Sequence, residues 1–500
     1  MRTLLPIPIT AALLLGCAGP LSQTPEARTG RYLASIRNQP ALLSVFLRQM
    51  PKGGELHTHL SGAVYAESYL RWAVADGMCV RRSPLSLVVP PCDSARGDAA
   101  AEILTRDPGL YNSLVDAFSM RHFDLAQGSG HDHFFATFDR FEARSERSGD
   151  MLAEVVARLA RQNTWYVEVM QSLGMSAARR LGQKAGWSDD LQKLRERLDA
   201  DDLTRIVAGA HSRIDAQEAR LRTLLRCGQP DADPGCRVTV RYLMQMLRTV
   251  PREEVFAQAV AAVAVIKSEP RVVGLNLVAP EDDPVARRDY SEHMRIVRYA
   301  TGGGKLVNVA LHAGELTPSL VSPEDASFHI REAVEVAGAR RIGHGTDIAW
   351  EYDAPSTLRM MAQRDVAVEQ CLTSAEVILG LRGTDHPFRL YQEGKVAQVL
   401  CTDDEGVSRT DLAREYQRAL TTWELTWHGL KNLARNALEY SFLSGDSLWQ
   451  RRYKPTPACT GDPVGAEMPS VACAAFLARS DKAREQWRLE SALRRFEQKW

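Results

Sequence analysis

Eight short runs of β-forming residues recur along this chain, and their alternation with helical stretches constrains the fold more than any other feature. The runs are Glu55–Leu60, Trp165–Gln171, Val238–Met244, Val272–Val278, Leu306–His312, Arg341–His344, Val366–Cys371 and Val396–Thr402. The amphipathic stretches between them include Met151–Arg161, Glu253–Ile266 and Glu324–Ala337. Alternating strands and helices indicate parallel βαβ units, and eight units predict an α/β fold closed into a (β/α)8 TIM barrel. On the pattern alone, an open doubly wound sheet is the alternative.

The residues outside these runs predict additions to the barrel. Two connections, residues 61–164 and 174–237, are oversized, and we interpret them as helical insertions rather than separate domains. Residues 18–30 have the composition of a flexible tether, and residues 31–50 have helical spacing interrupted at Pro40.

The last stretch, Ala475–Trp500, is predicted to be one helix with a single apolar stripe. The stripe consists of Leu489, Leu493, Phe496 and Trp500. We expect it to pack back on the barrel, with a dimer contact as the alternative.

The first seventeen residues predict export. Arg2 precedes an apolar run, and Gly16-Cys17 resembles a bacterial lipobox in which Cys17 becomes lipidated. An ordinary signal peptide with a chance cysteine is the alternative. Because Ala18 rather than Asp follows the cysteine, the resemblance implies an outer-membrane anchor facing the periplasm. No later run is apolar for long enough to span a membrane.

Cysteine spacing agrees with an exported protein. Six cysteines form close pairs, Cys79 with Cys92, Cys227 with Cys236 and Cys459 with Cys473, and these predict local disulfides. Cys371 and Cys401 lie in apolar runs and are expected to be reduced core residues. The alternative is that all eight are free thiols. Lys plus Arg and Asp plus Glu each number 62, and this zero formal net charge argues against a nucleic-acid partner.

Residues able to carry chemistry cluster where the predicted strands end. His57 and His59 share one face of the first strand, because residues two apart on a strand point the same way. The other candidates are His312, Glu315, His344, Asp403 and Asp404. Each motif alone has an ordinary reading, such as a core histidine, a turn histidine or a solvated carboxylate pair. Together they lie at the carboxyl ends of barrel strands, where such barrels keep their sites, and nitrogen-rich donors favour zinc.

In this order, the motifs resemble the adenosine deaminase branch of the amidohydrolase superfamily, a group of metal-dependent hydrolases. The supporting segments are Met50-Pro51-Lys52, Tyr166–Val169, Val273–Leu277, Glu369–Ser374, Arg414–Tyr416 and Ser441–Leu443. The resemblance covers roughly residues 50–445. In its extra amino-terminal region and expected disulfides, the chain is similar to the exported growth-factor-like deaminases of this branch.

The resemblance implies a role for each matching position. The ligands of one zinc ion per chain would be His57, His59, His312 and Asp403. Glu315 would give a proton to purine N1 as water adds at C6, with a pKa raised by burial and by Asp403 and Asp404. His344 would orient the attacking water and take its proton. Asp404 would accept a hydrogen bond at the N7 side of the ring, and Asp403 would belong to both the metal site and the catalytic set.

Three positions depart from the family pattern. Ser61 stands where an Asp usually meets the sugar, and Ala279 stands where the backbone of a Gly meets purine N3. Asn276 stands where an Asp often ends the fourth strand. The positions for zinc and proton transfer match the family, whereas the positions that would bind the sugar and the purine edge are altered.

We therefore expect zinc-dependent deamination of adenosine or 2′-deoxyadenosine to inosine or 2′-deoxyinosine and ammonia, outside the cytoplasm. The expected parts are a signal peptide over residues 1–17, a tether and helical segment over 18–50, the deaminase barrel over 51–445 and an extension over 446–500. One alternative is a deaminase of adenine or a modified adenosine. Another is a non-catalytic nucleoside-binding lipoprotein. The sequence sets no oligomeric state.

Overall fold

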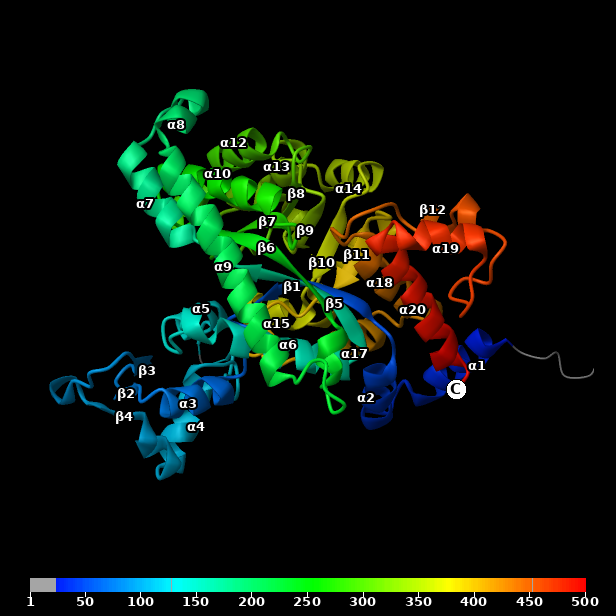
Figure 1. The fold of residues 1–500 in the computed structure, drawn as a ribbon, viewed down its shortest axis with the longest axis horizontal. Coiled ribbons are helices and arrows are strands. Elements are labelled where there is room, and N and C mark those ends of the chain that lie inside the picture. Colours follow the sequence, from blue (N-terminus) through cyan, green and yellow to red (C-terminus); the bar gives the residue numbers. More distant parts are fainter. Residues whose placement is uncertain (1–23, 127, 452) are drawn as a thin grey trace, which may run out of the picture.

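Eight parallel strands form a barrel surrounded by helices (Figure 1), which confirms the predicted (β/α)8 fold. The computed structural model describes residues 24–126, 128–451 and 453–500. Around the barrel the strands follow chain order, so the doubly wound alternative is wrong. They are β1 (Gly53–His59), β5 (Thr164–Gln171), β6 (Thr239–Leu247), β7 (Val272–Val278), β8 (Asn308–Ala313), β9 (Arg341–His344), β10 (Ala367–Gln370) and β11 (Ala397–Leu400).

The barrel closes just beyond the end of β11, against β1. The backbone N–H of Asp403 donates to the carbonyl of His57 at 2.9 Å, and the N–H of His59 donates to the carbonyl of Asp403 at 3.3 Å. The buried carboxylate of Glu55 accepts hydrogen bonds from the N–H of Thr402 at 3.1 Å and from its hydroxyl at 3.0 Å. These bonds join the first and last strands and satisfy backbone groups that would otherwise be buried unpaired.

The long amphipathic stretches are helices in two cases out of three. Two appear as α6 (Ser148–Arg161) and α10 (Arg252–Ser268). The prediction of one helix over 324–337 is wrong, because this stretch divides into a 3-10 turn, η5 (Asp325–Ser327), and α13 (His329–Glu335). The backbone of Phe328 leaves the helical conformation, and the Glu351 carboxylate accepts the N–H groups of Ile330 and Arg331. A side chain from another segment therefore caps α13.

The first insertion contains a small sheet that the sequence did not reveal. It holds α3 (Ala66–Ala75), β2 (Cys79–Arg82), β3 (Leu85–Val88), β4 (Asp98–Ala100), α4 (Pro108–Ala117) and α5 (Gly130–Phe138). In this sheet β2 pairs antiparallel with both β3 and β4, and the sheet projects from the barrel at the lower left of Figure 1. Strands of three or four residues are too short to show an alternating pattern.

The second insertion is helical, as predicted. It consists of α7 (Met175–Ala185), α8 (Leu191–Arg197) and α9 (Ala200–Leu224), and both α7 and α9 contact α10. The other helices are α11 (Pro284–Arg288), α12 (Tyr290–Thr301), α14 (Ala354–Gln363), α15 (Leu372–Leu379), α16 (Phe388–Glu393), α17 (Leu412–Thr422) and α18 (Trp427–Glu439). Strands β12 (Trp449–Arg451) and β13 (Lys454–Pro455) form a short hairpin after α18.

The amino-terminal segment is more ordered than predicted. Helices α1 (Pro25–Ile36) and α2 (Pro40–Gln49) meet at Pro40, as expected. A flexible tether over 18–30 is wrong for residues 25–30, which form the first turns of α1 behind an N-cap from Thr24. Thr29 and Leu33 are buried. The predicted signal peptide and lipidated Cys17 lie outside the described residues.

The carboxyl-terminal segment packs on the barrel, as predicted, but as two helices instead of one. These are α19 (Val471–Ala478) and α20 (Asp481–Glu497). Ser480 separates them because its hydroxyl caps α20 by accepting the N–H of Ala483 at 3.1 Å. Trp500 stacks on Tyr32 with ring centroids 4.6 Å apart, which joins the two ends of the described chain.

All three predicted disulfides are present, and Cys371 and Cys401 are buried free thiols, as expected. Among the described residues, no helix combines the length and apolar character needed to cross a membrane. The domain boundaries after residues 17, 50 and 445 stay predictions.

Candidate active site

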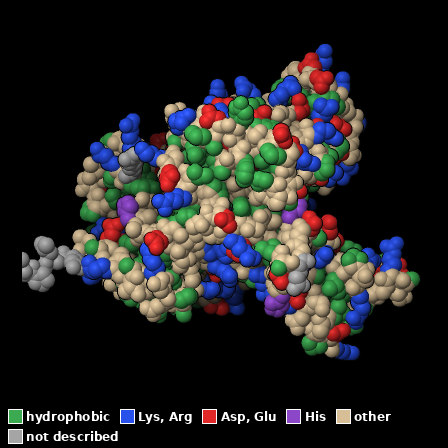
Figure 2. Space-filling model, turned by 180° about the vertical axis from the view of Figure 1, so that it is seen from behind, with side chains coloured by type: hydrophobic (Ala, Val, Ile, Leu, Met, Phe, Trp, Pro, Cys, Tyr) green, Lys and Arg blue, Asp and Glu red, His purple; other side chains and the backbone are tan. Residues whose placement is uncertain are grey.

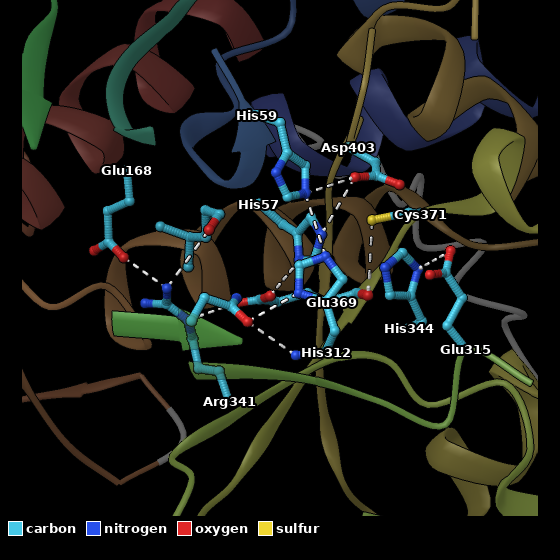
Figure 3. A network of polar contacts seen from close by, with 12 residues as sticks. His57, His59, Glu168, His312, Glu315, Arg341, His344, Glu369, Cys371 and Asp403 are labelled. Carbon is cyan, nitrogen blue, oxygen red and sulfur yellow. Dashed lines mark hydrogen bonds and ion pairs between the residues drawn. The ribbon is translucent and has the colours of Figure 1, made fainter. Parts of the chain in front are cut away.

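The barrel brings the predicted metal ligands together at the carboxyl ends of its strands (Figure 3). The Nε2 atom of His59 lies 3.2 Å from Nε2 of His312 and 3.2 Å from Oδ1 of Asp403. The Nε2 atom of His57 lies 3.4 Å from the same Asp403 oxygen. His344 belongs to the same buried cluster. Five side chains from four distant segments of the chain thus lie close together.

Each of the three predicted histidine ligands is held through its Nδ1 atom by an oxygen acceptor. The pairs are His57 with Glu369 at 2.6 Å, His59 with Gln245 at 2.9 Å and His312 with Asn276 at 2.9 Å. An Nδ1–H that donates outward leaves a lone pair on Nε2 pointing inward, which is how proteins orient metal-binding imidazoles.

The inward atoms fit a bound cation. The facing Nε2 lone pairs of His59 and His312 would repel each other at 3.2 Å unless a positive charge lay between them. Nε2 of His57 and Oδ1 of Asp403 are buried without a hydrogen-bond partner among the described residues. Buried polar atoms without partners are costly, and three imidazole nitrogens with one carboxylate are donors that zinc prefers. The assignment of individual ligands stays a prediction.

Glu315 lies next to His344 of this cluster, and the two side chains differ in proton affinity. Oε1 of Glu315 lies 3.5 Å from Nδ1 of His344. Burial, together with the negative charges of Asp403 and Glu281, raises the pKa of Glu315 well above its usual value. Burial lowers the pKa of His344 to about 3. At neutral pH this pair therefore consists of a protonated acid and a neutral imidazole. The expected contribution of Asp404 to Glu315 is supplied by Glu281 instead.

Glu281 is a buried residue that the sequence analysis missed. Its two carboxylate oxygens accept the N–H groups of Gly314 at 3.0 Å and Glu315 at 2.9 Å, so it holds the turn that carries the acid. His329 contacts the same carboxylate at 2.6 Å. Its position three residues after β7, at the carboxyl end of a barrel strand, is the signal that could have identified it.

Asp404 faces the cavity beside the metal cluster. A Cβ at Gly62 would lie 1.5 Å from its Oδ1, so only glycine allows this approach. That oxygen is buried without a partner among the described residues. Burial and the neighbouring Asp403 raise the pKa of Asp404 well above its usual value. A carboxyl held protonated in this way can donate a hydrogen bond, whereas the resemblance implies an acceptor, and the role of Asp404 toward substrate stays a prediction.

Gly343, the residue before His344, makes room for the imidazole of His57. A Cβ at Gly343 would lie 2.6 Å from Cε1 of His57, so this glycine lets the metal-site imidazole pass. The backbones of His344, Asp403 and Ala279 have φ values of 67°, 59° and 82°, a conformation that favours glycine. Strain of this kind concentrates at functional sites.

A cavity of about 460 Å³ opens above these residues. Ser61, Ala279 and Asp404 line it, as expected for substrate-side residues. Its other wall was not predicted, because it comes from α5 of the first insertion. The α5 residues are Phe134, Phe135 and Phe138, followed by Asp139.

A barrel with a histidine and carboxylate cluster at the carboxyl ends of its strands defines the class of metal-dependent hydrolases. Residues 120–450, more than half of the chain, match the family model described as adenosine deaminase. The chain belongs to the adenosine deaminase family of the amidohydrolase superfamily. The match begins after β1, and the structure is what places His57 and His59 in the same site.

Individual relatives agree with this assignment. An adenosine deaminase from Enterococcus faecalis is 32% identical over 142 residues, covering 28% of this chain and 38% of the relative. An N6-mAMP deaminase from Arabidopsis is similar in structure, with a TM-score of 0.52 and 20% identity over 80% of this chain and 95% of that one. An amidohydrolase from Burkholderia ambifaria, with bound Zn, has a TM-score of 0.51 and 18% identity over 81% and 88%. The chain spans less than two thirds of the curated relatives it matches.

We expect Glu369→Gln to weaken zinc binding by about 10- to 100-fold, because the His57 imidazole loses the carboxylate that orients it. Competition with a chromophoric chelator, on protein shown by circular dichroism to be folded, measures the affinity. The control Glu393→Gln changes an exposed carboxylate on α16 and should leave the affinity unchanged. Equal affinities for the two variants would contradict the role of Glu369.

We expect Ala279→Gly to raise the free energy of unfolding by about 1 kcal/mol, because glycine adopts a positive φ without the cost of a Cβ. The control Ala208→Gly, at an exposed position within α9, should lower it by about 1 kcal/mol. Urea unfolding measures both. A loss of stability in Ala279→Gly would show that the backbone there is not strained.

Proposed function

We propose that this protein hydrolyses the 6-amino group of adenosine or 2′-deoxyadenosine, using one zinc ion, to give inosine or 2′-deoxyinosine and ammonia. The observation that carries the proposal is the pairing of a protonated Glu315 with a neutral His344 beside the buried cation cluster. A protein that only binds nucleoside has no need for such a pair, so we favour an enzyme over a nucleoside-binding lipoprotein.

The residues that would hold zinc are His57, His59, His312 and Asp403. When bound, zinc supplies a Lewis acid that makes water nucleophilic near neutral pH. Zinc in the Burkholderia amidohydrolase, which shares this fold, supports the choice of metal.

The chain's own groups account for the proton transfers. Protonated Glu315 donates to purine N1, which draws electron density from the ring and makes C6 electrophilic. Neutral His344 accepts the proton that the attacking water loses. The protonated carboxyl of Asp404 donates to N7, because N7 carries a lone pair and no hydrogen. The C6–N bond breaks as the amino group leaves with a proton, as ammonia.

An unphosphorylated substrate is supported by the charges around the cavity. Its described lining contains the carboxylic residues Asp139, Glu315, Asp403 and Asp404 and no Lys or Arg. A nucleotide phosphate would find no Lys or Arg side chain to pair with there, whereas sugar hydroxyls can donate to a carboxylate. Asp139 is exposed and its side chain makes no hydrogen bond or ion pair within the described chain, so it is free to take the role of the Asp that Ser61 replaces.

A second candidate substrate class is a modified adenosine. The apolar wall of Phe134, Phe135 and Phe138 would accept a substituent larger than hydrogen. The Arabidopsis relative named as an N6-mAMP deaminase shares the fold, which supports a modified adenosine as the second candidate.

We also propose that the protein is exported and attached to the outer membrane through Cys17. Three disulfides support an oxidising compartment.

We expect zinc-loaded protein to deaminate adenosine and the Glu315→Gln variant to lose about 10²- to 10⁴-fold in kcat, because the amide cannot protonate N1. Loss of absorbance at the adenosine band measures turnover, over a panel of adenosine, deoxyadenosine, adenine, AMP and N6-methyladenosine. Zinc content should stay at one ion per chain in both proteins. If the zinc-loaded protein deaminates none of these purines, the proposed function is wrong. If the Glu315→Gln variant keeps its activity, Glu315 is not the proton donor.

We expect Asp139→Lys to lower kcat/KM for adenosine by about tenfold, through loss of one hydrogen bond to a charged acceptor. The same change should raise kcat/KM for AMP and leave adenine, which has no sugar, unaffected. The control Asp132→Lys makes the same change of charge on α5 at a side chain that is 81% exposed. If both variants change the ratio of kcat/KM for adenosine to kcat/KM for AMP equally, the effect comes from overall charge and not from Asp139.

A further inference from the structure

A second cavity, of about 490 Å³, lies between α7 and α9 of the second insertion, and it shares no lining residue with the active-site cavity. The α7 residues that line it are Gly174, at the N-cap, Ala177, Arg180, Leu181 and Lys184. The α9 residues are Asp202, Arg205, Ile206, Gly209 and Arg213. Positions three or four apart recur on both helices, so one face of each helix forms a wall. We call this cavity the α7–α9 groove.

The α7–α9 groove carries excess positive charge on a chain of zero formal net charge. Four cationic side chains and one carboxylate line it. On the face drawn in Figure 2, Lys and Arg are interspersed with Asp and Glu. The one carboxylate, Asp202, pairs with Arg205.

The remaining three cations form no close pair, and Lys184 interacts with Asp199 only at longer range. In the described part of the chain, the side chains of Arg180, Lys184 and Arg213 make no hydrogen bond or ion pair. The neighbouring Arg179 shows the contrast, because it contacts Glu254 of α10 at 2.6 Å. On α7, the basic side chain that packs against the barrel helices is therefore neutralised, and those that face the groove are not.

The floor of the α7–α9 groove is apolar and open. Leu181 and Ile206 are buried side chains. Gly209 lies between the arginines of α9, and a Cβ there would meet no atom within 4 Å. Glycine costs about 1 kcal/mol in a helix relative to alanine, and packing does not require it here. Its effect is to leave space between the two cationic rims.

We propose that the α7–α9 groove binds a phosphorylated organic molecule of nucleotide size. Guanidinium groups match the geometry of phosphate oxygens, and the unpaired Arg180 and Arg213 would provide them. The apolar floor would receive a base or another flat apolar body. The volume lies within the range of small-molecule sites. No Lys or Arg lines the active-site cavity among the described residues, so the two sites select different ligands.

Isothermal titration of the zinc-loaded, full-length protein with ADP tests the proposal, with saturating inosine present to occupy the active-site cavity. We expect saturable binding to one site, weakened at least tenfold in Arg180→Ala/Arg213→Ala. The control Arg195→Ala/Arg222→Ala removes the same charge from α8 and α9 outside the groove and should bind ADP normally. Pyrophosphate, which has no apolar body, should bind more weakly than ADP.

A variant that keeps every charge separates the groove from general attraction to a basic surface. Gly209→Leu fills the floor at a position where a side chain has room, and we expect it to fold and to lose ADP binding. Unchanged ADP binding in this variant would overturn the proposal, as would no binding of ADP at millimolar concentration. Binding to vesicles of anionic phosphatidylglycerol without binding of ADP would also overturn it, in favour of a membrane contact. None of these outcomes depends on deaminase activity.

Discussion

The interaction on which the rest of the structure depends is a buried chain of charges through the barrel, from Glu168 through Arg341 and Glu369 to His57 (Figure 3). Arg341 contacts Glu168 at 2.6 Å and Glu369 at 2.5 Å, and all three side chains are fully buried. Charges taken out of water are costly unless they are paired in good geometry. Each member is therefore constrained by its partners, and the last partner is a predicted metal ligand. The packing of the barrel interior therefore also fixes the position of His57.

The same logic extends to the rest of the site. Outer hydrogen bonds orient the imidazoles, and Glu281 holds the turn that carries Glu315. His344 and Asp403 keep a backbone conformation that the surrounding barrel imposes. A site built in this way holds its groups in place before substrate arrives, so little reorganisation is needed during the reaction. Burial supplies the proton affinities, since the same low-polarity surroundings keep a carboxyl protonated and an imidazole neutral.

The two insertions add what the barrel does not provide. The first places an aromatic wall and Asp139 over the histidine and carboxylate cluster, where Ser61 and Ala279 depart from the family pattern. The second forms a groove lined by four cationic side chains, which shares no lining residue with the active-site cavity. Barrels of this kind diversify through the segments after their strands, because those segments can change without disturbing the strand packing.

The sequence by itself determined the barrel, the strand that carries each candidate site residue and the disulfide pairs. Strand runs, motif positions and close cysteine pairs each depend on residues near one another in the chain, so the sequence alone can predict them. The hairpin strands around Cys79 were missed because they are too short to show a period. The cap that Glu351 places on α13 could not be seen because the two segments meet only in the folded chain. The placement of Glu281 and of the α5 phenylalanines at the site, and the raised pKa of Asp404, were decided by tertiary structure alone. Burial and neighbouring charge set their properties, and both depend on residues distant in sequence.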